Sequence, residues 1–564
     1  MNKKDKNKES RLSVGQKHRL LMPVIFAVVC FAVVQLATYM HFFRLLEYKT
    51  YDWRVAVRHW QKFAPLQADV HYKNSLVTVV PVDNRTNDLI QTPLIFWTAY
   101  FAEVFDYLIR NGAAVVALDY QFQISSDEYL NSKILEIFSK AKKDGKCNLE
   151  VDDIGDYLLK NDLKFGKAIR DKKVVLMIYL KHDGTVQMPY YKYLYMAGRD
   201  NLGLINSSPD EDGVVRRQFL VRSEVVPLNY YVFCAPYTGG SYGVFFALTG
   251  KPYPIFSLAA AGKLLQKNII TTPDGRIMLG DRNIPHNGDN EIMINYVGPP
   301  GTFMDKYSFV DLVKKAFEKD DDFFRKNFAG KAVLIGPGYV GSNDLIITPH
   351  KMFNGFEMFG IEVHANILNT ILNEDYIKKL SGMGNALILL ITSMVCAFTF
   401  YYFRPVHSVI PAFFYALILI AAGFITLYKY NLLINLASPI LMIPLCYALI
   451  YAYRYAVEDR EKRFIRKVLG RYISESVAEE ILKNPASLEL GGKRADVSIL
   501  FCDINDFTPF SEKTSSEEVI SILNDYFTRM EKIIFNNHGT LKQFVGDEIM
   551  VICGAPQPDP DPVS

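Results

Sequence analysis

The sequence predicts a multidomain membrane protein: an extracytoplasmic α/β domain, four transmembrane helices and part of a ferredoxin-like α+β domain at the C-terminal end. Three observations support this prediction. Long apolar runs concentrate near the start of the 564 residues and between positions 386 and 453. The region between these runs alternates strand-like and helix-like segments. The residues from position 493 onward follow a β-α-β-β pattern.

The first transmembrane helix is expected at 20–43. Residues 1–19 are rich in lysine and arginine, and a basic start followed by an apolar run also describes a signal peptide. This apolar run is longer than the core of a typical signal peptide, however, and it lacks a clear small-x-small cleavage site. We therefore expect an uncleaved helix, with residues 1–19 in the cytoplasm.

Three further transmembrane helices are expected at 386–403, 407–428 and 432–453, separated by short turns. Basic residues crowd directly after the last of them. With four spans both termini lie in the cytoplasm, as the positive-inside rule requires, and residues 45–384 are extracytoplasmic. The spans carry no intramembrane charge, which argues against a transporter.

The extracytoplasmic region alternates strands and helices. Strand-like runs lie at 75–83, 113–122, 173–180, 292–298 and 331–336, and helical runs lie at 96–111 and 359–372. This order predicts an α/β domain with a largely parallel sheet.

Five local runs in this region form a recognisable set: ALDYQF at 117–122, PDEDGVVRRQ at 209–218, INYVGPPGTF at 294–303, GKAVLIG at 330–336 with Asp344 and Thr348-Pro349 after it, and GIEVHANIL at 360–368. Together they resemble the second subtype of the CHASE sensor domain, an extracellular module of bacterial cyclases and histidine kinases. Three transmembrane helices directly after such a domain are usual in that family. The resemblance implies a sensor domain over 45–384 whose extracellular ligand is unknown.

Polar residues of this region allow two interpretations. Asp83 and Asp119 end strands at the edge where open α/β sheets place their ligand pockets, and Arg216, Arg217 and His364 lie in the runs quoted above. They can form a ligand site. Alternatively, the aspartates cap helices or turns, the arginines form structural ion pairs and the histidine packs on a helix face, and we favour this structural interpretation.

Composition and cysteine spacing add two points. The net charge of +3 is close to neutral, so we expect no nucleic-acid partner. A disulfide between Cys147 and Cys234 is conceivable in an exported domain, although their spacing has no framework signature.

A cytoplasmic linker helix is expected at 454–490. Its apolar residues recur at spacings of three and four, which suits an amphipathic helix. Two chains could pair such stripes into a short coiled coil, although a stripe of this kind more often packs against its own domain. The linker is the only covalent route between the membrane and the C-terminal segment.

The C-terminal segment 493–564 has the order strand, helix, strand, strand. An apolar strand at 497–502 ends at Asp503, and Ser515-x-x-Glu518 is a capping box that starts an amphipathic helix. Two further strands flank a tight Gly546-Asp547 turn. This is the first two thirds of a ferredoxin-like unit, in which the end of the first strand lies beside that turn, so Asp503 and Asp547 can converge.

Two converging carboxylates can hold two Mg²⁺ ions, one lowering the pKa of an attacking hydroxyl and the other neutralising a polyphosphate leaving group. The backbone amides of Asn505, Asp506, Phe507 and Thr508 enter a turn and could meet phosphates. Alternatively, one aspartate caps a turn and the other suits a turn conformation. Without further context the two interpretations are equally good.

The pattern F-x-D-I-x-x-F-T, here Phe501 to Thr508, followed by the Gly546-Asp547 hairpin, resembles the class III nucleotidyl cyclases. The stretch 469–494 also looks like the lead-in of bacterial members. The resemblance implies that Asp503 and Asp547 bind two Mg²⁺ or Mn²⁺ ions, assisted by the Ile504 carbonyl. It further implies attack of a nucleotide 3′-hydroxyl on its own α-phosphorus, giving a 3′,5′-cyclic nucleotide and pyrophosphate, in a homodimer of a bacterial inner (plasma) membrane.

The nucleotide base is not fixed by this pattern. Adenylate-specific members have a lysine three residues before the hairpin glycine, and guanylate-specific members have a glutamate; this chain has Gln543, with Lys542 one place earlier. Glutamine can donate or accept a hydrogen bond. We expect ATP rather than GTP, because cyclases of this architecture are mostly of that type. The expected nucleotide-binding residues are Asn505, Asp506, Phe507, Thr508, Lys542, Gln543 and Gly546.

Catalytic domains of this family are longer than segment 493–564. The later strands, a second base-recognising position, and the asparagine and arginine that stabilise the transition state have no counterpart in the sequence. A homodimer cannot supply groups that neither chain has, so we assign no catalytic side chain and expect little or no cyclase activity from this polypeptide. The alternative function is a non-catalytic membrane sensor or dimerisation protein with a remnant cyclase module.

Overall fold

The computed structural model describes residues 14–59, 76–130, 132, 151–181, 185–222, 232–234, 242–244, 252–286, 290–304, 307–339, 341–342, 344–469 and 494–555. The chain divides into two compact units. One comprises Ala27–Val395 and Val409–Ile443, and the other comprises Met1–Phe26, Cys396–Ser408 and Pro444–Ser564.

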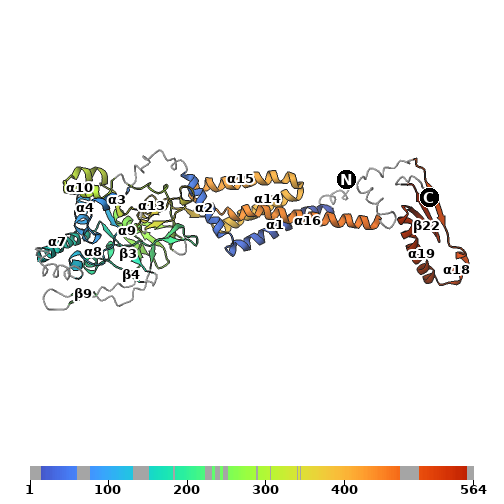
Figure 1. Ribbon diagram of the computed structural model, residues 1–564, viewed down its shortest axis with the longest axis horizontal. Helices are drawn as coiled ribbons and strands as arrows, with labels where there is room; N and C mark the ends of the chain where they lie inside the picture. Colours follow the sequence, from blue (N-terminus) through green and yellow to red (C-terminus); the bar gives the residue numbers. More distant parts are fainter. Residues whose placement is uncertain are drawn as a thin grey trace, which may run out of the picture. The chain divides into compact units, whose positions relative to one another are not determined.

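A parallel sheet forms the centre of the first unit (Figure 1). Its strands, in spatial order, are β1 (Val77–Val82), β16 (Ala332–Pro337), β2 (Val115–Leu118), β3 (Val174–Leu180) and β5 (Leu202–Leu204), all parallel to their neighbours. β4 (Val186–Gln187) adds an antiparallel pair to β3. The strands β1 and β2 are buried along their whole length, which explains their nearly continuous apolar sequence. The predicted parallel α/β domain is confirmed.

Helices cover both faces of this sheet. α9 (Phe256–Leu265) and α13 (Gly360–Leu372) pack together over one face, where α13 contacts β1 and β16. α4 (Thr98–Arg110), α7 (Val151–Ile169) and α10 (Phe309–Phe317) form the other layer, with α11 (Asp321–Phe328) packed against α4. The three layers bury one continuous hydrophobic core.

One predicted strand lies elsewhere. The run expected at 292–298 is extended only as β15 (Glu291–Met293), which pairs antiparallel with β7 (Val215–Phe219) outside the parallel sheet. The apolar sequence IMINYVG was a correct sign of burial, but Asn295 donates its side chain to Asp375 and Val297 donates its amide to Asn366 instead of a strand neighbour. β7 pairs in turn with β6 (Ser208–Pro209).

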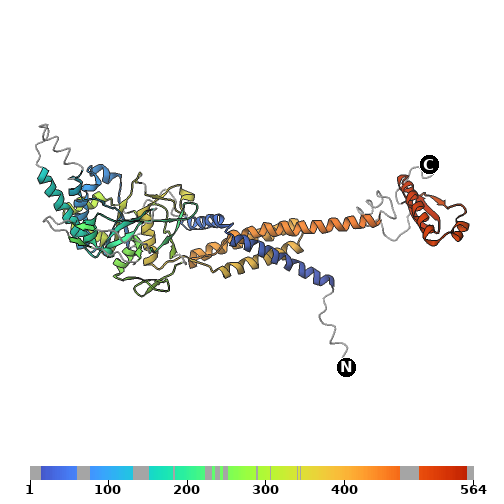
Figure 2. The same cartoon turned by 90° about the horizontal axis from the view of Figure 1, so that it is seen from below.

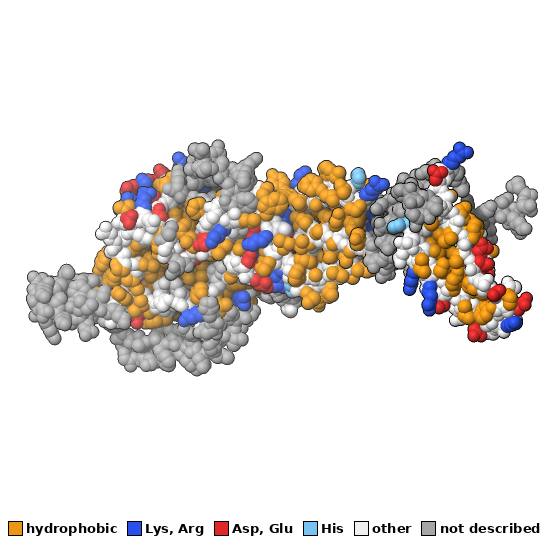
Figure 3. Space-filling view, turned by 45° about the vertical axis from the view of Figure 1, so that its right-hand side comes forward, with side chains coloured by type: hydrophobic (Ala, Val, Ile, Leu, Met, Phe, Trp, Pro, Cys, Tyr) orange, Lys and Arg blue, Asp and Glu red, His pale blue; other side chains and the backbone are white. Residues whose placement is uncertain are grey.

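Within the described residues, four helices are long and apolar enough to cross a membrane, as predicted, with spans at Leu21–Tyr39, Gly382–Tyr402, Pro405–Tyr430 and Ala437–Val457. They belong to α1 (Val14–Tyr39), α14 (Gly382–Tyr402), α15 (Pro405–Tyr430) and α16 (Ala437–Leu469), which Figure 2 shows from a second side. Thr38 of α1 shares a hydrogen bond of 2.9 Å with Ser438 of α16. Large apolar side chains such as Phe413, Phe414 and Ile418 face outward, and hydrophobic side chains cover this segment in Figure 3.

The last span begins later than predicted. Leu432 and Leu433 form β20 (Leu432–Leu433), which pairs with β19 (Lys378–Lys379), and the helix starts only at Ala437. At the other end α16 continues as one helix to Leu469, into the predicted linker. The rest of the linker lies outside the described residues, as does Cys147 of the conceivable disulfide.

The C-terminal module has the predicted order with one added short helix. β21 (Ser498–Cys502) is followed by α18 (Phe507–Lys513), α19 (Ser516–Asn536), β22 (Thr540–Val545) and β23 (Glu548–Cys553), and the antiparallel sheet has the order β21-β23-β22. Ser515 caps α19 by accepting a hydrogen bond from the Glu518 amide. Ile534 of α19 packs on Leu541, Ile549 and Val551.

Shorter elements connect these parts: α2 (Arg44–Arg58), α3 (Asn84–Leu89), α5 (Ser126–Tyr129), α8 (Tyr191–Ala197), α12 (Lys351–Asn354), β8 (Val221–Arg222), β9 (Val232–Cys234), β10 (Tyr242–Val244), β11 (Tyr253–Pro254), β12 (Ile269–Thr271), β13 (Ile277–Leu279), β14 (Arg282–Ile284), β17 (Leu345–Ile346), β18 (Met358–Phe359) and the 3₁₀ turns η3 (Leu94–Phe96) and η5 (Arg199–Asn201).

Candidate functional site

Strand register brings Asp503 and Asp547 together in the C-terminal module. β21 pairs with β23 up to Cys502 opposite Ile549, so Asp503 follows at the level of the β22–β23 turn. Gly546 in that turn has φ of +63°, a left-handed conformation that glycine adopts without steric cost. The turn therefore presents Asp547 next to the end of β21.

A single backbone amide joins the two carboxylates. The Ile504 N–H donates to Asp503 Oδ1 at 3.1 Å and to Asp547 Oδ2 at 3.2 Å. Interaction with Asp547, by hydrogen bonding and by charge, raises the pKa of Asp503, and partial desolvation adds to the effect. Two like charges thus share one small region with no cation between them in the described module, an arrangement that a bound cation would stabilise.

These residues fit a hard divalent cation. Asp503 and Asp547 offer carboxylate oxygens, and Mg²⁺ typically takes one or two carboxylates, substrate phosphates and several waters. The Ile504 carbonyl accepts a hydrogen bond from the Phe507 amide at 3.3 Å and keeps a second lone pair for a metal. The described residues contain no group of three or more His, Cys, Asp or Glu side chains that could hold a metal by itself.

The expected nucleotide-binding residues fall into two sets. Asn505 and Asp506 form the turn before α18, Asp506 with φ of +60°, and Phe507 and Thr508 begin that helix. In the chain these four lie shortly after Asp503. Lys542 and Gln543 are exposed on β22, where the register shifts by one residue between Leu541 and Gln543. No described contact joins Lys542 or Gln543 to the carboxylates.

In the sensor region, most of the polar residues that the sequence singled out are structural. Asp83 caps α3, its Oδ1 accepting from the Thr86 amide at 2.9 Å and the Ser308 hydroxyl at 2.7 Å. His364 lies buried on α13 between the Ser257 hydroxyl and the Ile205 carbonyl, and burial lowers its pKa to about 4. The structural interpretation is therefore confirmed for both residues.

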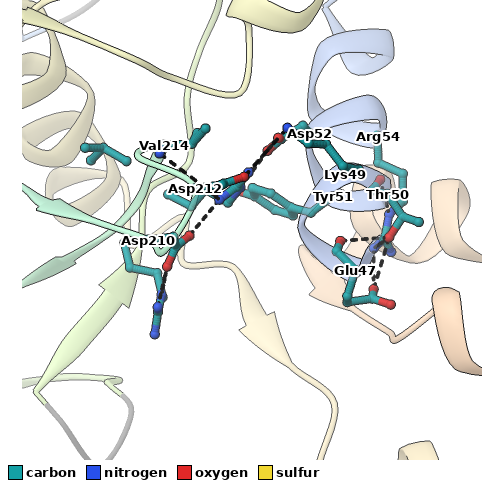
Figure 4. A network of polar contacts seen from close by, with 12 residues as sticks. Glu47, Lys49, Thr50, Tyr51, Asp52, Arg54, Asp210, Asp212 and Val214 are labelled. Carbon is teal, nitrogen blue, oxygen red and sulfur yellow. Dashed lines mark hydrogen bonds and ion pairs between the residues drawn. The ribbon is translucent and has the colours of Figure 1, made fainter. Parts of the chain in front are cut away.

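Arg216 is the centre of a buried ion-pair network. Figure 4 labels its partners Asp52, Asp210 and Asp212. Its guanidinium donates to both carboxylate oxygens of Asp52 at 2.6 and 2.7 Å, to Asp212 at 2.8 Å and to Asp210 at 2.9 Å. Arg217 bonds to Asp210 and to Glu291. Both arginines thus have structural partners, and Arg216 ties the β6–β7 hairpin to helix α2.

Helix α2 also holds the start of α16. Glu47 accepts hydrogen bonds from the amides of Leu436 at 3.0 Å and Ala437 at 2.8 Å. Arg54, which is completely buried, bonds to Glu47 at 3.1 Å and to the Ile434 carbonyl at 3.0 Å. One short helix therefore carries polar contacts to the α/β domain and to the first turn of a membrane helix (Figure 4).

Sequence reasoning missed this helix. The signal was present: Glu47, Asp52 and Arg54 follow the first apolar span at spacings that suit an amphipathic helix, although their partners lie far away in the sequence. Asp119, in contrast to Asp83, is not a cap, and its surroundings are described below.

Comparison with known families agrees with this architecture. The model of the CHASE2 domain matches residues 25–398, which is more than half of the chain. The chain belongs to the CHASE2 domain family. The adenylate and guanylate cyclase catalytic domain matches residues 492–564, after the last of the four apolar helices.

Curated relatives are similar over a short part of the chain. Adenylate cyclase 1 of Rhizobium meliloti is 37% identical over 84 residues, covering 14% of this chain and 13% of that protein. Receptor-type guanylate cyclase gcy-19 of Caenorhabditis briggsae is 35% identical over 108 residues, covering 18% of this chain and 9% of that protein. The chain thus spans less than a fifth of the length of these relatives.

Proposed function

We propose that this CHASE2 protein is a membrane-bound, sensor-regulated nucleotidyl cyclase that converts ATP into a 3′,5′-cyclic nucleotide and pyrophosphate. The observation that carries the catalytic part is the Ile504 amide bonded to both Asp503 and Asp547, since it brings together two carboxylates of the matched cyclase domain. ATP is favoured over GTP by the bacterial relative named as an adenylate cyclase, while Gln543 suits either base.

The chain's own residues supply binding and orientation. Asp503 and Asp547, with the Ile504 carbonyl, would hold two Mg²⁺ or Mn²⁺ ions, which supply a more acidic attacking hydroxyl and charge neutralisation at the phosphates. The turn amides of residues 505–508 are placed to orient phosphate oxygens. Lys542 and Gln543 would contact the nucleotide in a homodimer.

The sensor half would act through helix α2. A change in the CHASE2 domain that moves the β6–β7 hairpin also moves α2 through Asp52 and Arg216, and α2 holds the first turn of α16 through Glu47. α16 continues toward the cyclase domain. We place both termini in the cytoplasm of a bacterial inner membrane, because basic residues follow the last span.

Manganese binding to the purified chain in detergent, followed by electron paramagnetic resonance, tests the metal site. Asp503→Asn together with Asp547→Asn should weaken Mn²⁺ binding by at least about tenfold, because mutating residues that only support the metal ligands already lowers metal affinity by about that factor. Asp525→Asn is the matched control, because Asp525 is an exposed carboxylate of α19 paired with Arg529. Equal weakening in both variants would contradict the proposal.

Nucleotide binding tests the substrate. Fluorescent ATP and GTP analogues titrated with Mn²⁺ should show tighter binding of the ATP analogue, and the double variant should lose both. Metal binding without nucleotide binding would favour the alternative, a non-catalytic sensor.

A further inference from the structure

A cleft of about 850 Å³ lies at the carboxyl edge of the parallel sheet in the CHASE2 domain. Residues that follow β2, β3, β5 and β16 line it, among them Asp119, Lys181, Asn206 and Asp344. The carboxyl edge of an open α/β sheet is the usual place for a ligand, and the volume is that of a small-molecule site.

Asp119 lines this cleft, and its carboxylate has no partner among the described residues. It follows β2 directly, and its side chain is only 7% exposed. Its amide donates to the Ile335 carbonyl at 2.8 Å, which fixes the backbone, but no described residue forms a hydrogen bond or ion pair with its carboxylate. Gly336 on the neighbouring strand makes room for it, because a Cβ at position 336 would lie 2.9 Å from the Asp119 Cβ.

Asp344 lies in the same cleft and repeats the pattern. Its Oδ2 is buried with no hydrogen-bond partner among the described atoms. The Gly360 amide donates a hydrogen bond to the main-chain carbonyl of Asp344 at 2.9 Å. Because glycine has no side chain, position 360 leaves space for the Asp344 carboxylate. Burial raises the pKa of both groups, and the charge of Asp344 raises that of Asp119 further.

The remaining charged groups of the cleft do not balance these two. Glu291 is bonded to Arg217 at 3.0 Å, the Arg222 guanidinium lies 4.7 Å from the ring centroid of Phe219, and Lys181 is exposed. Apolar and aromatic side chains line the rest: Tyr120, Met177, Tyr179, Leu180, Ile205 and Phe219. The cleft therefore combines an anionic inner end with an apolar wall.

We propose that this cleft binds a small organic ammonium ion with an apolar body, whose ammonium group Asp119 and Asp344 hold. An ammonium donates up to three hydrogen bonds, and oxygens of these two carboxylates, among them the unbonded Oδ2 of Asp344, can accept them. A bare metal ion suits the site less well, because the described residues bring no third His, Cys, Asp or Glu side chain to the two aspartates and the volume far exceeds one ion. The inference deepens the proposed sensor role by naming a ligand class.

Calorimetric titration of the purified full chain in detergent, at pH 7.5, tests the proposal directly. Phenethylamine, tryptamine and cyclohexylamine are the probes, and 2-phenylethanol is the uncharged counterpart of the first. We expect at least one amine to bind and 2-phenylethanol to bind about tenfold more weakly or not at all, since a charge-assisted hydrogen bond is worth that factor.

Two variants and a control locate the site. Asp119→Asn and Asp344→Asn should each weaken amine binding by about tenfold or more. Asp83→Asn is the matched control, because it alters a strand-end aspartate of the same sheet that is already hydrogen-bonded, and its amine affinity should not change. A thermal unfolding scan confirms that each variant is folded.

Failure of all three amines to bind overturns the proposal, as does equal binding of amine and alcohol or unchanged affinity in both variants. Because binding is measured without cyclase activity, such a failure leaves the metal and nucleotide tests of the C-terminal module untouched. Loss of manganese binding at that module would likewise leave the amine result standing.

Discussion

Two groups of buried charged side chains in the CHASE2 domain differ in whether the chain itself supplies the opposite charge. Around Arg216, one cation meets the carboxylates of Asp52, Asp210 and Asp212, and each is hydrogen-bonded. In the cleft, Asp119 and Asp344 are two anions with no cation bonded to either in the described domain. The first group is complete within the folded chain, whereas the second leaves negative charge for something that the chain does not contain.

Whether a buried carboxylate has a partner within the chain therefore distinguishes a structural role from a binding role better than its residue type does. Burying a charge costs free energy unless an opposite charge is paired with it. Two buried carboxylates without a cation are therefore stable only when they are protonated or bind a ligand. Asp83 supports the distinction, because it also ends a strand of this sheet but its Oδ1 already accepts from Thr86 and Ser308.

Removing the cation from the complete group should have the largest effect. Arg216→Met leaves the buried Asp52 carboxylate without its cation and removes one partner each from Asp210 and Asp212, and we expect a loss of about 3–5 kcal/mol in the free energy of unfolding. The thermal unfolding midpoint of the full chain in detergent measures it. Arg217→Met is the control, because Arg217 is only partly buried and should cost less. Similar losses in both variants would show that the Arg216 group is not special.

Neutralising an unpaired acid should have the opposite sign. Burial raises the pKa of Asp344 from 3.8 to about 6, so the folded state holds a proton that the unfolded state releases between these values. Stability therefore falls as pH rises from about 4 to 6, and the penalty is fully present above that range. Asp344→Asn should raise stability by about 1–3 kcal/mol at pH 7.5.

The same variant should change stability little at pH 4, where Asp344 is protonated. Asp119, whose pKa burial also raises, and Glu362, whose pKa burial raises to about 7, add to the pH dependence of the parent chain. Unfolding midpoints between pH 4 and 8, without added amine, measure the effect. A variant that is less stable than the parent at pH 7.5 would show that the Asp344 carboxylate has a partner.

The capped strand end gives an intermediate prediction. Asp83→Ala removes the cap of α3 and leaves the Thr86 amide and the Ser308 hydroxyl without their acceptor, so we expect a loss of about 1–2 kcal/mol. Asp88→Ala, in the same helix, is the control, since its carboxylate caps nothing in the described structure. Thermal unfolding at neutral pH distinguishes the two, and equal midpoints would rule out the capping role.

The sequence predicted these regions unevenly, for physical reasons. Parallel strands, four apolar spans and the convergence of Asp503 with Asp547 follow from local periodicity and one tight turn, which short segments contain. The Arg216 group does not, because Asp52 lies 164 residues away from Arg216 and only the fold brings them together.

Local sequence also failed where tertiary neighbours decide. Asp83 and Asp119 both end apolar strands. Asp83 accepts hydrogen bonds from Thr86 and Ser308, whereas Asp119 lies near the like charge of Asp344. Leu432 and Leu433 continue an apolar run that suggests a membrane helix, but pairing with Lys378 and Lys379 makes them a strand. In both cases the residue type alone did not decide the structure, and the tertiary contact partner did.

Helix α2 yields the smallest predicted effect and links the complete charge group to the membrane helices. Glu47 accepts hydrogen bonds at the N-terminus of α16, where a negative charge also interacts favourably with the helix dipole. Glu47→Gln keeps the shape and a side-chain oxygen that can still accept from Arg54, so the loss that arises from the missing charge at the N-terminus of α16 is only about 0.5–1 kcal/mol. Glu211→Gln is the matched control, because Glu211 is an exposed carboxylate paired with Arg44.

Thermal unfolding of both variants against the parent measures this difference. A second readout is limited proteolysis of the connection before α16, where the Glu47 variant alone should be cut faster, since the Leu436 and Ala437 amides lose a charged acceptor. If Glu211→Gln has the same effect on cleavage, α2 does not hold the start of α16 through Glu47. The coupling from Arg216 to the membrane helix would then have to run through Arg54, which bonds to the Ile434 carbonyl on the same connection.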